Sequence, residues 1–191
     1  MQRNIYLNNV MELLSTHYKE RVIPELKKEL GIANIYALPK IIKVVVNVGI
    51  RQDQKTAELT KAIERTLLRV TGQKPVSTKA KKSIAAFKTR AGMDIGYKVT
   101  LRGSRMYDFL TKLINITLPR VRDFRGVPSS AVDKNGNLTI GIRENIVFPE
   151  IASDEVLSIH GLSITIATNA NSREHGTALF KALGFPFEKK Q

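Results

Sequence analysis

The chain has 191 residues and carries 31 Lys and Arg against 17 Asp and Glu, a formal net charge of +14 at pH 7. Its length predicts one domain over 1–191, and an apolar fraction of 42% is typical of a globular chain. No apolar run approaches the ~18 residues of a membrane-spanning helix. The absence of cysteine excludes disulfides, thiolate catalysis and Cys-ligated metal sites.

The positive charge is concentrated in the middle of the chain. Residues 74–125 hold 13 basic and 3 acidic residues, whereas residues 127–191 hold 6 basic and 7 acidic ones. Such clustering favours an anionic partner, because an incidental surface charge would be spread evenly. Nucleic acid is the first candidate. An acidic membrane surface is the second, but no basic amphipathic helix supports it, and no membrane partner is expected.

The N-terminal half predicts a helix, a strand and a second helix. Residues 1–30 have helical spacing, either as two short helices or as one helix kinked at Pro24, with Gly31 as the cap. Residues 40–49 are rich in β-branched residues and predict a strand. Alternation along it predicts two faces: Ile42, Val44, Val46 and Val48 on one, and Lys43, Val45 and Asn47 on the other. Residues 54–71 predict an amphipathic helix that ends at Gly72.

The second half continues with strands and two helices. Strands are predicted over residues 73–79, 97–103, 138–142 and 162–166, and helices over 105–118 and 172–183. Between the first two of these strands lies a basic protruding loop, residues 79–90, with five Lys or Arg and no acid. Pro119 is expected to end the helix before it, and Asn135-Gly136 is a strong hairpin signal.

The order of elements predicts an α+β fold, a mostly antiparallel sheet with helices packed on one face and an exposed polar face. That face is expected to carry Lys43, Asn47, Lys98, Thr100, Arg102, Thr139, Arg143, Ser163 and Thr165. Amides, hydroxyls and cations suit phosphates and ribose hydroxyls, so we interpret it as an RNA-binding face. The alternative is the solvated face that antiparallel sheets often have.

No catalytic or metal-binding pattern is present. His17, His160 and His175 have no metal-ligand spacing, and neither a phosphate-binding glycine loop nor a nucleophile motif occurs. We therefore expect no enzyme activity, no metal and no cofactor. Of the aromatic residues near the cations, Tyr97 and Tyr107 are expected in core or boundary positions, and Phe87 and Phe124 are left open for base stacking.

Several longer motifs occur in a fixed order and carry a resemblance. They are Pro39–Gly49 (PKIIKVVVNVG), Thr71–Pro75 (TGQKP), Thr78–Ala85 (TKAKKSIA), Lys98–Gly103 (KVTLRG), Leu118–Gly126 (LPRVRDFRG) and Gly184–Phe187 (GFPF). In these motifs the chain resembles the family of the fifth protein of the large ribosomal subunit, in its bacterial or organellar form. The resemblance covers residues 18–187 and leaves residues 1–17 as an N-terminal helical extension.

The resemblance implies a non-enzymatic protein of the central protuberance of the large subunit. Its implied partners are 5S rRNA, 23S-type rRNA, P-site tRNA, neighbouring large-subunit proteins and a small-subunit protein at an intersubunit bridge. Together with the sheet pattern, it predicts a 5S rRNA site of Lys43, Asn47, Gln73, Thr78, Lys98, Thr100 and Arg102. It places Lys79, Lys81, Lys82 and Ser83 on a tRNA-facing loop, and Arg122, Asp123, Phe124 and Arg125 near the bridge.

The chain also departs from the family pattern. Arg51 and Ala86 stand where the family often has Gly, and residues 132–137 replace the usual hairpin sequence. Two other functions stay open from the residues alone: an RNA-processing enzyme and a general acidic-surface adaptor. The implied location is a cytoplasmic ribosome, with an organellar ribosome as the alternative.

Overall fold

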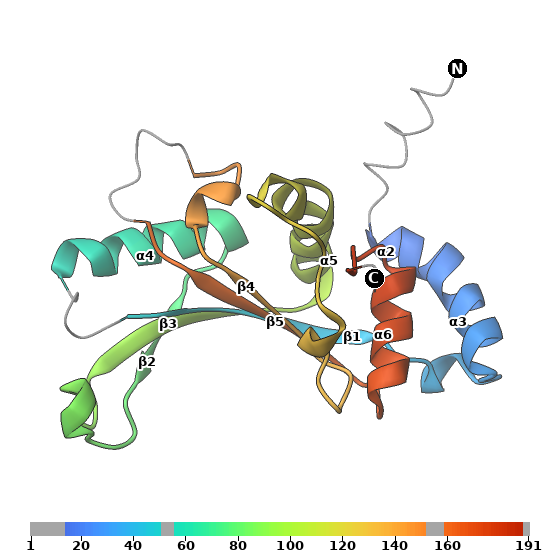
Figure 1. The fold of residues 1–191 in the computed structure, drawn as a ribbon, viewed down its shortest axis with the longest axis horizontal. Coiled ribbons are helices and arrows are strands. Elements are labelled where there is room, and N and C mark those ends of the chain that lie inside the picture. Colours follow the sequence, from blue (N-terminus) through green and yellow to red (C-terminus); the bar gives the residue numbers. More distant parts are fainter. Residues whose placement is uncertain (1–13, 51–55, 152–158, 189–191) are drawn as a thin grey trace. The chain divides into compact units, whose positions relative to one another are not determined.

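The computed structural model describes residues 14–50, 56–151 and 159–188 (Figure 1). The helices are α2 (Leu14–His17), α3 (Ile23–Leu30), α4 (Ala57–Thr71), α5 (Gly103–Lys112) and α6 (Arg173–Ala182). The strands are β1 (Ile41–Gly49), β2 (Val76–Lys79), β3 (Asp94–Leu101), β4 (Leu138–Ile142) and β5 (Leu162–Thr168). They form one antiparallel sheet in the order β2-β3-β1-β5-β4, which confirms the α+β prediction.

The chain divides into two compact units, and the division falls within strands β1, β4 and β5. Unit 1 comprises residues 1–44, 102–139 and 166–191, and unit 2 comprises residues 45–101 and 140–165. The predicted N-terminal extension is described only from Leu14 onward, because residues 1–13 lie outside the described part of the chain.

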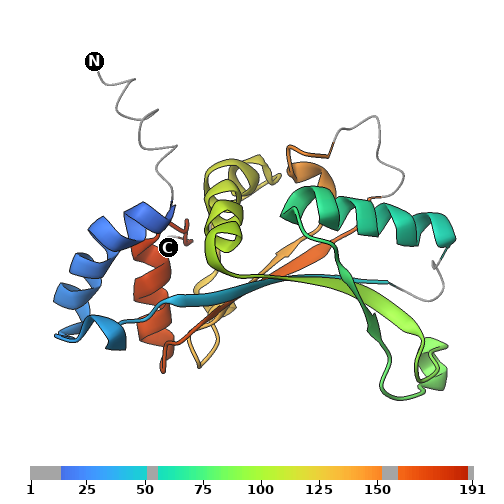
Figure 2. The ribbon, with the colours of Figure 1, turned by 180° about the vertical axis from the view of Figure 1, so that it is seen from behind.

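In unit 2, helix α4 covers one face of β3 (Figure 2). Thr56 begins the helix by accepting a hydrogen bond from the Leu59 N–H, and Gly72 ends it with a φ of 65°. Both ends therefore follow the expected capping chemistry. The side of α4 that faces the strands is formed by Ala62, Ile63, Thr66, Leu67, Val70 and Thr71, all buried.

Burial alternates along the strands as the sequence predicts. In β3, Val99 and Leu101 are buried, whereas Lys98 is exposed and Thr100 is half-buried. Burial alternates in the same way along β4 and β5. Strand β1 is the exception at its start, because Ile42 is 43% exposed and Ile41 is buried instead. The prediction that Ile42 shares the buried face was wrong. Buried Ile41 and Val44 are three residues apart, so the two-residue repeat begins only at Val44.

In unit 1, two proline residues are each preceded by a wider helical turn. A π-helical turn, Tyr18–Val22, joins α2 to α3, and the Ile23 N–H bonds to the carbonyl of Tyr18 five residues back. The same arrangement precedes Pro119, where Leu113–Thr117 is π-helical and a 3₁₀ turn continues to Arg120. Because proline lacks an N–H, the extra residue lets the helical path pass each proline instead of ending there.

The Asn135-Gly136 turn packs directly on helix α6. The Gly136 carbonyl accepts a hydrogen bond from Thr168 Oγ1 at 2.8 Å. A methyl group on Gly176 would lie 2.5 Å from the Cα of Gly136, so only glycine fits this contact.

Burial alone would raise the pKa of Asp133, but hydrogen bonds from Asn137 and Asn135 hold that pKa below its ordinary value. Across the turn, the Asp133 N–H bonds to the Asn137 carbonyl at 2.9 Å and Val132 pairs with Leu138 in an antiparallel bridge, as the hairpin prediction requires.

A second close backbone contact joins β3 to β1 in unit 2. A methyl group on Gly96 would lie 2.5 Å from the Val48 carbonyl oxygen and 3.1 Å from Thr78 Oγ1. The carbonyl belongs to a neighbouring strand and has little room to move. Gly96 is therefore required for the strands to approach beside two residues of the predicted RNA site, Asn47 and Thr78.

We expect Gly96→Ala to lower the free energy of unfolding by about 1–3 kcal/mol, because the added methyl overpacks the strand contact. Gly141→Ala is the matched control, since Gly141 also lies in a strand of unit 2 but has no atom within 4 Å of the added methyl. It should leave stability unchanged or raise it by about 0.5–1 kcal/mol. Urea unfolding of both variants measures the difference, and equal losses would contradict this explanation.

Candidate nucleic-acid interface

The pairing of β2 with β3 brings polar side chains onto one face of unit 2. Val76 pairs with Lys98 and Thr78 pairs with Gly96 in the antiparallel register. Side chains of directly opposite residues point to the same side of a sheet, and residues two apart on one strand share that side. Val76, Thr78, Lys98 and Thr100 therefore lie on one face, opposite buried Val99 and Leu101.

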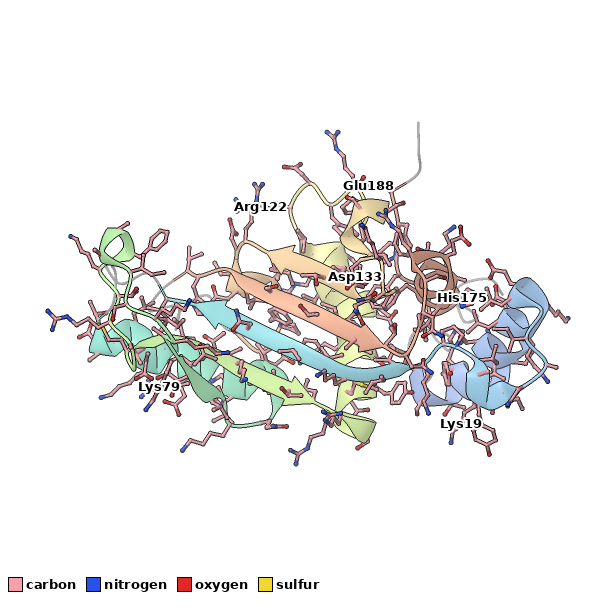
Figure 3. All side chains as sticks on the ribbon, turned by 90° about the horizontal axis from the view of Figure 1, so that it is seen from below. Lys19, Lys79, Arg122, Asp133, His175 and Glu188 are labelled. Atoms are coloured by element: carbon pink, nitrogen blue, oxygen red, sulfur yellow. The ribbon has the colours of Figure 1, made fainter. Side chains whose placement is uncertain are left out.

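Strand β1 adds Asn47 to this face. Asn47 is exposed, while Val46 and Val48 on either side of it are buried. Figure 3 looks onto the sheet from the side opposite α4, with the strands in front of that helix. We call Asn47, Thr78, Lys98 and Thr100 the open face of unit 2. It offers an amide, two hydroxyls and a cation on a surface that no described helix of unit 2 covers.

Three residues of the predicted 5S rRNA site lie elsewhere. Gln73 is half-buried in the connection between α4 and β2, where its N–H donates to Thr71 Oγ1 at 3.3 Å. Lys43 and Arg102 belong to unit 1. Lys43 is half-buried in β1, and Arg102 is the exposed residue that precedes α5. The structure thus brings four of the seven predicted residues onto the open face.

The basic loop is closed by hydrogen bonds across its backbone. Ile84 and Thr89 exchange two N–H···O bonds of 3.0 and 3.2 Å, and Ala80 bonds to Met93 and Gly92 on the returning strand. The Ser83 hydroxyl accepts a bond from the Ala91 N–H at 3.0 Å. Ser83 therefore braces the loop, in addition to its predicted place on the tRNA-facing surface.

The cations of this loop point to solvent. Lys79, Lys81, Lys82, Lys88 and Arg90 are all exposed, and no acidic residue occurs between Lys79 and Arg90. Figure 3 marks Lys79 at the end of β2, where the loop begins. Lys88 has a φ of 51°, an uncommon backbone conformation for a residue other than glycine. The loop is thus a defined structure whose charged side chains are all positive.

The predicted bridge segment lies in unit 1. Arg122, Asp123 and Arg125 are exposed, and Phe124 is half-buried. The segment ends at Val127, which forms a parallel bridge with Phe187. The Val127 N–H bonds to the Pro186 carbonyl at 2.7 Å. The Glu188 N–H bonds to the Val127 carbonyl at 3.1 Å. Two motifs that are distant in the sequence, RDFRG and GFPF, therefore meet in one structural unit.

Two exposed apolar residues lie near the cations. Sequence reasoning did not include Val76 in the site, and it left Phe87 open for base stacking. Val76 is 62% exposed and stands opposite Lys98 on the open face. Phe87 is 70% exposed at the tip of the basic loop, whereas Tyr97 and Tyr107 are half-buried, as expected. The signal for Val76 was its spacing of two residues from Thr78.

The described residues contain no cluster of metal-ligating side chains. No group of three or more His, Cys, Asp and Glu within residues 14–50, 56–151 and 159–188 is placed to hold a metal ion. His17 and His160 each contact a neighbouring segment, through the Ala182 carbonyl and Asn145 respectively. Over the same ranges, no helix has both the length and the apolar character needed to cross a membrane.

Comparison with known proteins decides the family. Residues 34–90 match the family described as ribosomal protein L5, and residues 94–187 match the model of that ribosomal family's C-terminus. The chain belongs to the ribosomal protein L5 family. This confirms the resemblance carried by the motifs, and it makes the chain a structural ribosomal protein rather than an enzyme.

Curated relatives of the L5 family match nearly the whole chain. The large ribosomal subunit protein uL5 of Halothermothrix orenii is 50% identical over 179 residues, which cover 94% of this chain and 100% of the relative. The uL5 proteins of Desulfatibacillum aliphaticivorans and Mycoplasma mycoides are each 51% identical, over 94% and 92% of this chain and 100% and 98% of their own lengths. The similarity thus extends over both units.

Gly126 anchors the bridge segment, and its substitution tests that anchor. A methyl group on Gly126, whose φ is 117°, would lie 2.6 Å from the Glu188 nitrogen. Gly184 also has a positive φ, 85°, but no atom lies within 4 Å of its added methyl. We expect both alanine variants to be strained, and Gly126→Ala to lose about 1–3 kcal/mol of stability beyond Gly184→Ala.

Hydrogen exchange at the Val127 and Glu188 amides measures whether the bridge opens. Protection should fall in Gly126→Ala and persist in Gly184→Ala. Retained protection in Gly126→Ala would show that the contact is not the anchor.

Proposed function

We propose that this chain binds 5S rRNA as a constituent of the large ribosomal subunit and presents its basic loop to P-site tRNA. The observation that carries the proposal is the open face of unit 2, where Asn47, Thr78, Lys98 and Thr100 stand on strands that α4 covers only from the other side. The exposed loop cations between Lys79 and Arg90 supply the second contact. The protein acts in the ribosome of the cytoplasm.

The open face recognises RNA through its shape and its polar groups. The Asn47 amide and the two threonine hydroxyls donate and accept hydrogen bonds, which suits ribose 2′-hydroxyls and phosphate oxygens. Lys98 adds one phosphate contact. Rigid strands hold these groups at fixed spacing, so the surface distinguishes a folded RNA by its shape. Gln73, Lys43 and Arg102 extend the proposed 5S rRNA contact beyond this face.

The basic loop binds RNA through charge. Lys79, Lys81 and Lys82 neutralise phosphates and release counterions, so their contribution falls with salt. The backbone bonds that close the loop limit the conformational entropy lost on binding. Through this loop the protein contacts the P-site tRNA.

Unit 1 supplies the remaining contacts of the proposal. Arg122, Asp123, Phe124 and Arg125 face a small-subunit protein at an intersubunit bridge, and 23S-type rRNA and neighbouring large-subunit proteins surround the chain. The exposed arginines and the anchored backbone at Val127 support this assignment. The matched curated relatives are named as large ribosomal subunit proteins, which supports the same assembly.

Separate variants of the two surfaces test the division of labour. Asn47→Ala with Lys98→Ala should weaken 5S rRNA binding by about tenfold or more, because it removes one hydrogen-bonding group and one charge-assisted contact. Lys81→Ala with Lys82→Ala should leave 5S rRNA binding unchanged and weaken the tRNA contact, lowering its salt slope by about one per lost phosphate contact. Filter binding of purified 5S rRNA and tRNA at several salt concentrations measures both effects.

Three results would contradict the proposal. An equal loss of 5S rRNA binding in the two double variants would refute the division of labour. Absent binding of 5S rRNA by the folded chain would refute the 5S rRNA contact itself. Equal affinity for heparin, anionic vesicles and 5S rRNA would instead support a general acidic-surface adaptor.

A further inference from the structure

A large cavity lies beside the basic loop, entirely within unit 2. Its volume is about 990 Å³, and its apolar lining comes from Ile50, Ala80, Ile84, Phe87 and Ile95. Cavities of this size enclose small organic groups and usually combine an apolar wall with a few polar groups that orient the ligand. Phosphate contacts alone require no such wall, so the cavity has no part in the charge-based role proposed above.

The apolar wall is held open to solvent by the loop backbone. Phe87 is 70% exposed and Ile84 is 46% exposed. The short 3₁₀ turn Ala85–Phe87 is closed by the Lys88 N–H on the Ala85 carbonyl at 2.9 Å, with Lys88 at a φ of 51°. The loop backbone thus presents Phe87 and Ile84 as an exposed apolar patch, a kind of surface that commonly marks a binding site.

The rim of the cavity is positive. Lys81, Lys82 and Lys88 line it together with the apolar residues, and the described residues that line it include no acid. A complementary occupant therefore carries a flat apolar group and an anionic group within a few ångströms of each other. A nucleotide has this pairing in every unit of an RNA chain, and base–aromatic stacking is sequence-tolerant.

We propose that this cavity receives one unstacked nucleobase of an RNA, with Phe87 stacked on the base and the rim lysines on its phosphates. The inference rests on the proposed RNA-facing role of the loop and adds to it a base-binding subsite. The lysines then supply salt-dependent affinity, and Phe87 supplies a contribution that salt does not change.

The test compares two RNA pentamers of equal charge, one fully normal and one with its central base removed. The full-length protein should bind the normal pentamer about tenfold more tightly, which is within the range expected for one stacked base. Phe87→Ala should abolish that preference without changing the salt slope, and Phe87→Trp should keep it. Placing 2-aminopurine at the central position should give fluorescence quenching on binding that Phe87→Ala removes.

The matched control is Tyr36→Ala. Tyr36 is 88% exposed in the 3₁₀ turn Ile35–Ala37 of unit 1, so this variant also removes an exposed ring but leaves the cavity intact. It should retain the tenfold preference. Both rings are exposed, so neither variant is expected to unfold the protein, and circular dichroism checks this.

Equal affinity of the wild-type protein for the two pentamers would overturn the inference, as would a preference that survives Phe87→Ala. Displacement of the pentamer by an acidic, Phe-containing peptide at lower concentration than by RNA would overturn it in favour of a protein partner. Failure of the proposed loop function appears separately, as unchanged tRNA affinity in the Lys81→Ala, Lys82→Ala variant.

Discussion

In unit 2, helix α4 covers only one face of the sheet. Every second residue of a strand therefore points to the covered side. Val46, Val48, Val99 and Leu101 fill that side beneath α4, and the residues between them are left for other use. Because successive residues on one face are about 6.6 Å apart, the open face is a row of groups at regular spacing. Gly96 lets β3 lie close to β1, since any side chain there would push β3 away from the Val48 carbonyl. The groups of the open face therefore depend on the packing behind them.

The basic loop solves a different problem, that of holding like charges close together. Five cations within twelve residues repel one another, and an unbraced loop would spread them apart. The reciprocal bonds between Ile84 and Thr89, and the Ser83 brace, fix the backbone against this repulsion. The lysines are therefore held close together before any anionic partner binds, so less conformational entropy is left to lose on binding.

Sequence reasoning was most successful where a periodic pattern determined the structure. The alternation in β3, the apolar stripe of α4 and the glycines that end helices could be predicted from side-chain chemistry alone. It failed at Ile42, because the start of β1 is fixed by a distant contact in unit 1. There Asn169 accepts a bond from the Lys40 N–H and donates its own N–H to the Lys40 carbonyl. No local pattern contains that information.

The candidate site shows the same limit. Lys98 and Thr100 could be placed on a face from their own strand, and Val76 shares a face with Thr78 by its spacing. That these two pairs lie on the same face became known only from the register of β2 against β3. Likewise, the meeting of Val127 with Phe187 joins residues about sixty positions apart. The exposure of Phe87 depends on the next residue, Lys88, whose φ of 51° lies in the left-handed region. A lysine gives no sequence signal for that conformation. Residue types could be predicted, whereas their neighbours across the sheet could not.

Ala86 connects the apolar cavity to the chain's departure from its family. The resemblance implies glycine at this position, and Ala86 is one of the residues that line the cavity. Its φ is not among the positive values, so alanine fits the loop without the strain that a glycine conformation would impose. Alanine also has fewer accessible backbone conformations than glycine in the unfolded chain, which lowers the entropy lost when the loop folds. Relative to glycine, Ala86 thus adds apolar surface to the cavity wall and restricts the backbone beside Phe87.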